Sequence, residues 1–130
     1  MNIPILLYHS VSDDSTSVYQ PWAISPARFE QHMAYLREQG YQPITLTNIA
    51  DAIRSGGTGF PEHPVAITFD DGMADFLHGA VPILGKYNFP ATLFVTTGYV
   101  GHTSRWLTEE GEGDRPMLSW KEIASIKNVE

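Results

Sequence analysis

The sequence predicts one α/β domain in which parallel strands alternate with helices. The chain has 130 residues, of which 42% are hydrophobic, and this is enough for the core of a single domain. Short apolar runs alternate along the chain with segments of helical periodicity. The apolar runs are nearly continuous and do not alternate with polar residues, which is typical of parallel strands that helices cover.

Each expected element has its own local signal. Apolar and partly β-branched runs predict strands over residues 3–8, 44–46, 65–69 and 91–96. Apolar residues at helical spacing predict helices that begin at Pro26, Asn48, Met73 and Ser119.

The boundaries of these elements follow from residues with known capping and breaking preferences. Ser25 is a typical N-cap for the first helix, and Thr47 is the expected cap of the second. Pro82 should kink or shorten the third helix, because proline removes a backbone donor. Glu122 is placed for a capping box at the start of the last helix. The segment 98–116 reads as a long loop.

Polar side chains follow two of the predicted strands at the point where each strand ends. His9 comes directly after the first strand, and Asp70 and Asp71 come directly after the strand 65–69. In parallel sheets the chemistry collects at the carboxyl ends of the strands. We therefore expect these three side chains at one edge of the sheet.

Composition restricts the partners of the chain. Eight basic residues against fifteen acidic ones give a formal charge of -7, and without a basic cluster the sequence disfavours nucleic acid as a partner. No apolar run has the roughly 18 residues of a membrane span. The amino terminus lacks the features of a signal peptide, so the chain as written is expected in the cytoplasm, with an exported form left open. The absence of cysteine excludes disulfides and thiolate zinc sites.

The neighbouring carboxylates of Asp70 and Asp71 allow two interpretations. In the functional one, the two side chains point to different sides as they leave the strand, so that one binds a divalent cation and the other accepts a proton from water. Gly72 would then supply the tight turn that follows. In the alternative, Asp-Asp-Gly is an ordinary turn after a strand, with one aspartate as a helix cap.

The wider context favours the functional interpretation. The segment VAITFDDG, followed further on by FPATLFV, resembles the polysaccharide deacetylase family, also called the NodB-homology or carbohydrate esterase 4 group. The opening LLYHSVSD resembles the branch of poly-N-acetylglucosamine deacetylases. The resemblance implies a distorted (β/α) barrel, a divalent metal with zinc as the expected ion, and hydrolysis of an N-acetyl or related amide. It also implies Asp70 as the general base, Asp71 as a metal ligand and His9 as the general acid.

The sequence departs from the family pattern in its histidines. The metal site of the family is normally completed by two histidines in a motif of the type H-[ST]-x-x-x-H, and none of the five histidines here forms such a pair. His78 is the best substitute ligand, although its place on a helix should direct it away from the strand end. We therefore expect an incomplete metal site, and residues 1–130 to be the N-terminal portion of a longer deacetylase domain or a variant without catalysis.

Two hypotheses of function follow. The first is a metal-dependent hydrolase of N-acylated sugars, in which metal-bound water attacks the acyl carbon. The second is a catalytically inactive domain that binds glycans or serves as a scaffold. The loop aromatics could stack on sugar rings or pack against the domain surface, and they are Tyr19, Trp22, Tyr99 and Trp106. An open barrel edge also predicts association into homo-oligomers.

Overall fold

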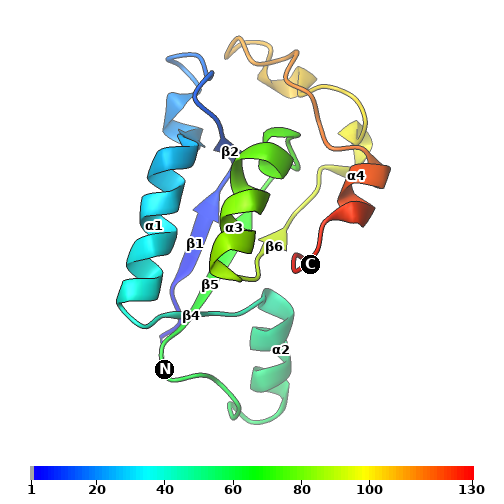
Figure 1. Cartoon of the computed structure of the whole chain (residues 1–130). Coiled ribbons are helices and arrows are strands. Elements are labelled where there is room, and N and C mark those ends of the chain that lie inside the picture. Colours follow the sequence, from blue (N-terminus) through cyan, green and yellow to red (C-terminus); the bar gives the residue numbers. More distant parts are fainter. Residues whose placement is uncertain (1) are drawn as a thin grey trace.

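The computed structural model describes residues 2–130 and has the predicted α/β class. Its main sheet is parallel and centred on β5 (Pro64–Phe69), which pairs along one side with β1 (Ile5–Tyr8). β4 (Gln42–Pro43) pairs with the start of β5, and β6 (Thr92–Leu93) pairs with its end. The four strands form an open sheet (Figure 1), so barrel closure is not seen within residues 2–130.

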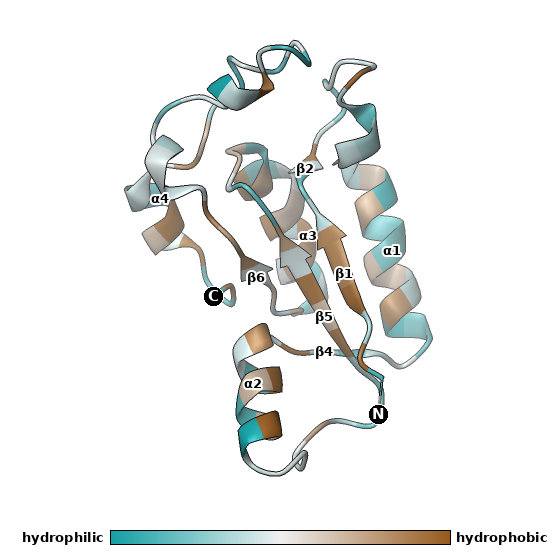
Figure 2. Cartoon of the chain, turned by 180° about the vertical axis from the view of Figure 1, so that it is seen from behind, coloured by the Kyte–Doolittle hydropathy of each residue, from teal (hydrophilic) through white to brown (hydrophobic). Residues whose placement is uncertain are grey.

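Helices α1 (Pro26–Glu38) and α3 (Val81–Tyr87) lie on the same side of this sheet in both views (Figures 1 and 2). Between them and β5 lies the core, in which Phe29, Phe69 and Phe76 are fully buried. The Phe69 ring lies 5.6 Å from the Phe29 ring and 4.7 Å from the Phe76 ring, both edge-on. This packing holds β5, and therefore the residues that follow it, in a fixed position.

The other face of the sheet is less covered. Seen from behind, β1 and β5 have no helix in front of them (Figure 2), and Ile5 and Leu7 are 57% and 56% exposed. Phe94 is also exposed. Association of copies through the open barrel edge stays a prediction.

The remaining elements are short. β2 (Ser10–Val11) and β3 (Ala23–Ile24) form a second small parallel sheet. α2 (Leu46–Arg54) and α4 (Trp120–Ser125) complete the α-helices. Single 3₁₀ turns span Gln20–Trp22, Thr97–Tyr99 and Arg105–Leu107. Within residues 2–130, no helix has the length and apolar content needed to cross a membrane.

The predicted start of the second helix is wrong by two residues. Thr45, not Thr47, is the N-cap of α2, because its hydroxyl accepts from the Asn48 N–H while the Asn48 amide oxygen accepts from the Thr45 N–H. This capping box begins the helix at Leu46 and leaves no strand over 44–46. The strand lies earlier, at Gln42–Pro43.

The helix expected from Met73 to Tyr87 is interrupted, and Pro82 had indicated a kink or a shorter helix. A π-helical turn, Phe76–Ala80, precedes α3, and Pro82 lies in the first turn of α3, where its missing N–H costs nothing. The strand expected over 91–96 is also shorter than predicted, since only Thr92 and Leu93 pair with β5.

Candidate functional site

The candidate site is built on the carboxyl ends of β1 and β5. These strands are parallel and in register, with Tyr8 opposite Phe69, so His9 and Asp70 leave the sheet side by side. The Asp70 N–H donates to the Tyr8 carbonyl at 2.9 Å. His9 Nε2 lies 4.0 Å from Asp70 Oδ2, which is beyond hydrogen-bond distance but within reach of an ion pair. The predicted proximity of these two residues is confirmed, while their roles stay predictions.

Asp71 occupies an unusual backbone conformation directly after the strand. Its φ is +75°, and that of Gly72 is +79°. Aspartate enters this left-handed region more readily than most residues, and glycine does so freely. A Cβ on Gly72 would lie 3.3 Å from Val95 Cγ1, so the site also requires a small residue for close packing. The Asp71 carbonyl accepts from the Thr96 N–H at 3.1 Å, which fixes the turn.

This turn leaves Asp71 lining a cavity of about 170 Å³. The other lining residues come from the loops and are His9, Tyr19, Trp22, Leu107 and Glu110. Burial raises the pKa of the Asp71 carboxyl, the charge that His9 can carry lowers it, and the Asp70 carboxylate raises it further. The cavity thus combines acidic, aromatic and titratable groups at the predicted edge of the sheet.

The four loop aromatics separate into two pairs. Tyr19 and Trp22 line the cavity, with their rings 6.1 Å apart and nearly parallel. Tyr99 and Trp106 pack against each other edge-on at 4.7 Å and do not line it. Of the first pair, Trp22 is 50% exposed and can present a ring face to a ligand, whereas Tyr19 is buried.

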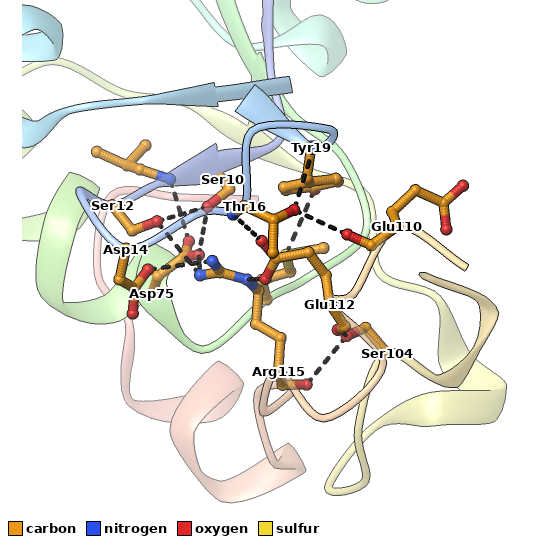
Figure 3. A network of polar contacts seen from close by, with 12 residues as sticks. Ser10, Ser12, Asp14, Thr16, Tyr19, Asp75, Ser104, Glu110, Glu112 and Arg115 are labelled. Atoms are coloured by element: carbon orange, nitrogen blue, oxygen red, sulfur yellow. Dashed lines mark hydrogen bonds and ion pairs between the residues drawn. The ribbon is translucent and has the colours of Figure 1, made fainter. Parts of the chain in front are cut away.

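A buried polar network lies beside the cavity and joins the two loops that form it (Figure 3). At its centre the Arg115 side chain is 8% exposed and pairs with three carboxylates. Its Nη1 donates to Asp75 at 3.1 Å, its Nη2 to Asp14 at 3.0 Å, and its Nε to Glu112 at 3.0 Å. Asp75 also accepts from the Ser10 hydroxyl at 2.6 Å.

This network was not predicted from the sequence. Arg115 lies in the segment expected to be only a long loop, and its partners Asp75 and Asp14 are 40 and 101 residues away in the sequence. Contacts between residues so far apart in the sequence leave no local pattern from which they could be predicted. The other residue missed is Glu110, which lines the cavity from the same loop.

The network should make folding stability depend on pH. Burial acts to raise the pKa of Glu112, but hydrogen bonds from the Thr16 N–H and from Arg115 outweigh it and hold that pKa below its ordinary value. A carboxyl with a depressed pKa adds stability above its unfolded pKa and loses it as the pH falls through the folded value. We expect the melting temperature to fall between about pH 5 and pH 2, and to fall less in Glu112→Gln.

Thermal unfolding followed by circular dichroism over this pH range tests this expectation. Glu109→Gln is the matched control, because Glu109 is exposed on the same loop. If Glu112→Gln and the wild type lose stability over the same range and by the same amount, Glu112 does not contribute as described.

Comparison with known proteins identifies the family of the chain. A sequence model of the polysaccharide deacetylases matches residues 57–128, more than half of the chain. The chain belongs to the polysaccharide deacetylase family. The match includes the Asp70–Asp71–Gly72 turn and the loop that holds Arg115, and it confirms the resemblance seen in the sequence.

Individual relatives agree with the family assignment. Over 112 residues the chain is 32% identical to the poly-β-1,6-N-acetyl-D-glucosamine N-deacetylase of Staphylococcus aureus (strain MSSA476), covering 86% of this chain and 36% of that protein. It is 37% identical over 108 residues to the protein YxkH of Bacillus subtilis (strain 168), covering 83% of this chain and 36% of YxkH.

A solved structure shows the same fold. The deacetylase PplD of Streptococcus pyogenes, solved in complex with acetate, superposes with a TM-score of 0.75 at 29% sequence identity. The superposition covers 99% of this chain and 54% of PplD. The chain therefore spans about half of that structure and little more than a third of the two curated relatives.

The residues described do not by themselves fit the metal that this family generally uses. Within residues 2–130, no group of three or more histidine, cysteine, aspartate or glutamate side chains is arranged to hold an ion. His78, the substitute ligand considered above, lines a different cavity together with Asp75 and Arg115. A transition-metal site normally needs three or four protein ligands, so we derive no catalytic step through a metal from these residues.

Proposed function

We propose that this chain carries part of the active site of a hydrolase that removes N-acetyl or similar acyl groups from a carbohydrate. The reaction breaks a carbon–nitrogen bond that is not a peptide bond. The observation that supports the proposal most is the gathering of His9, Asp70 and Asp71 at one sheet edge, beside a cavity with aromatic walls. A structural turn alone would not require an imidazole beside the carboxylate pair.

The proposed roles follow from the chemistry of amide hydrolysis. Water adds to the acyl carbon, the carbon–nitrogen bond breaks, and the amine leaves with an added proton while the acyl group leaves as a carboxylate. Asp70 is partly exposed, with no hydrogen bond to its carboxylate, and would accept the proton of the attacking water. His9, 4.0 Å away, would protonate the departing amine. The role of Asp71 as a ligand of a divalent metal stays a prediction.

The substrate class is inferred from the relatives and from the walls of the cavity. The related Staphylococcus aureus protein is named for poly-β-1,6-N-acetyl-D-glucosamine, and PplD was solved with acetate. Trp22 lines the cavity and is 50% exposed, so its ring offers aromatic surface of the kind on which sugars stack. We therefore propose an N-acetylated sugar polymer as the substrate.

A second candidate is a glycan-binding domain without catalysis. It is favoured by the single predicted metal ligand, Asp71, among residues 2–130. This domain would keep the aromatic cavity and bind the same sugars without releasing acetate.

Release of acetate separates the two candidates. We expect a protein that contains this chain together with the rest of its deacetylase domain, supplied with zinc, to release acetate from β-1,6-linked N-acetylglucosamine oligomers, as measured by an enzyme-coupled acetate assay. The matching glucosamine oligomer, which has no acyl group, is the control substrate. Binding of the acetylated oligomer without any acetate release would contradict the first candidate and support the second.

A further inference from the structure

The position of the His9 ring depends on how the chain is held on both sides of that residue. The 4.0 Å between His9 Nε2 and Asp70 Oδ2 is too long for a hydrogen bond, so this contact alone does not fix the ring. Before His9, the Tyr8 carbonyl accepts from the Asp70 N–H at 2.9 Å. After His9, the chain passes from β1 into β2, and there it contacts Asp75.

Asp75 holds the two residues that follow His9. Its Oδ2 accepts from the Ser10 hydroxyl at 2.6 Å (Figure 3), and its Oδ1 accepts from the Val11 N–H at 3.1 Å. Ser10 and Val11 are 0% and 1% exposed, so water does not compete for these bonds. Hydrogen bonds to a carboxylate are also stronger than those between neutral groups. The two bonds therefore fix the backbone directly after His9.

Asp75 is itself held in place from two directions. Arg115 Nη1 donates to its Oδ2 at 3.1 Å, and the Asp75 side chain is only 13% exposed. The π-helical turn that follows Asp75 packs directly on β2, since a Cβ on Gly79 would clash with the Val11 carbonyl oxygen. The carboxylate therefore has little freedom to move away from the chain that it holds.

We propose that Asp75 is a positioning residue of the site, and that its bonds to the chain after His9 set the place of the imidazole relative to the Asp70 carboxylate. Asp75 does not line the cavity that Asp71 and His9 line, so it acts through His9 and not on the substrate. The catalytic meaning of this arrangement rests on the proposed function, in which His9 is the acid and Asp70 the base. The placement of His9 by Asp75 rests on the contacts alone.

Kinetics of a protein that contains the whole deacetylase domain test the effect on the reaction. Asp75→Ala is expected to lower kcat for acetate release from N-acetylglucosamine oligomers by about 10²-fold, the cost of misplacing a catalytic group by about 1 Å. KM should stay as in the wild type, because Asp75 does not line the cavity. Ser10→Ala should lose less, since the Val11 N–H keeps its bond to Asp75.

Nuclear magnetic resonance of the same protein tests the placement of His9 without turnover. The signals of the His9 ring protons are assigned by their loss in His9→Gln. We expect these signals to shift in Asp75→Ala, because the backbone after His9 is released, and to shift less in Ser10→Ala. If Asp75→Ala does not fold, Ser10→Ala carries the same test, since it removes only one hydroxyl.

Glu112→Ala is the matched control for a loss of stability. Like Asp75, Glu112 is a buried carboxylate partner of Arg115, with its side chain 7% exposed, but it accepts from the Thr16 N–H and not from the chain after His9. Both variants should lower the melting temperature, and only Asp75→Ala should shift the His9 signals. Unchanged signals in Asp75→Ala, or equal shifts in the two variants, would overturn the proposal.

The two measurements separate this inference from the proposed function. If the His9 signals shift in Asp75→Ala alone but the wild type releases no acetate, the placement of His9 by Asp75 holds and the hydrolase proposal fails. If the wild type releases acetate and Asp75→Ala keeps its kcat, the hydrolase proposal holds and the inference fails.

Discussion

Replacing Asp70 by asparagine is expected to lower kcat for acetate release by about 10²–10⁴-fold, the usual contribution of a general base. Asparagine keeps the size of the side chain but has no basic form that can accept a proton from water. Because Asp70 is partly exposed and its carboxylate holds no other side chain by a hydrogen bond, the fold should tolerate the change. Initial rates of acetate release from N-acetylglucosamine oligomers measure the effect.

Asp13→Asn is the matched control for this experiment. Asp13 is an exposed residue of the loop after β2 and carries no proposed role. Its substitution removes the same charge and should leave kcat within about 2-fold, as expected for a surface change away from the site. If Asp70→Asn released acetate as fast as Asp13→Asn, Asp70 would not be the base.

Replacing Arg115 by methionine is expected to lower the free energy of unfolding by about 3–5 kcal/mol, the typical cost of removing one partner from a buried ion pair. The Asp75 and Glu112 side chains are 13% and 7% exposed, so they would be left desolvated without their cation. Methionine retains much of the apolar stem, which separates the loss of charge from the loss of packing. Urea unfolding followed by circular dichroism measures the change.

Arg54→Met provides the comparison. Arg54 pairs with Asp51 at 3.0 Å, the same length as two of the Arg115 contacts, but both side chains are largely exposed. Such surface pairs contribute about 0–1 kcal/mol. Equal losses in the two variants would show that burial adds nothing to the Arg115 network.

Local signals predicted most of the fold. Ser25 and Ser119 were correctly placed as N-caps because each cap uses a hydrogen bond to a backbone N–H three residues along the chain. Thr45 and Thr47 could not be separated in this way, since they lie in one Thr-Leu-Thr run and only the contact with Asn48 selects the first. The lengths of the strands depended on distant pairing. β6 ends at Leu93 because its partner β5 ends at Phe69, and Ala91 bridges Val129.

The contrast between local signals and distant contacts also explains which site residues could be predicted. His9, Asp70 and Asp71 could be grouped because parallel strands bring their carboxyl ends to one edge. Glu110 and Arg115 could not be assigned, since their segment has no hydrophobic period and their contacts reach residues from the first 20 of the chain. The three residues at the strand ends could therefore be grouped from the sequence, while the loop residues around them could not.

The contacts of Arg115 have a consequence for the exchange of parts between relatives. They join the segment that contains Ser12 and Asp14 to the segment that contains Glu112, and both segments contribute walls to the same cavity. A chimera that takes only one of these segments from another member of the family could separate the Arg115 cation from its carboxylate partner Asp14. A change in the walls of this cavity would then require both segments to be replaced together.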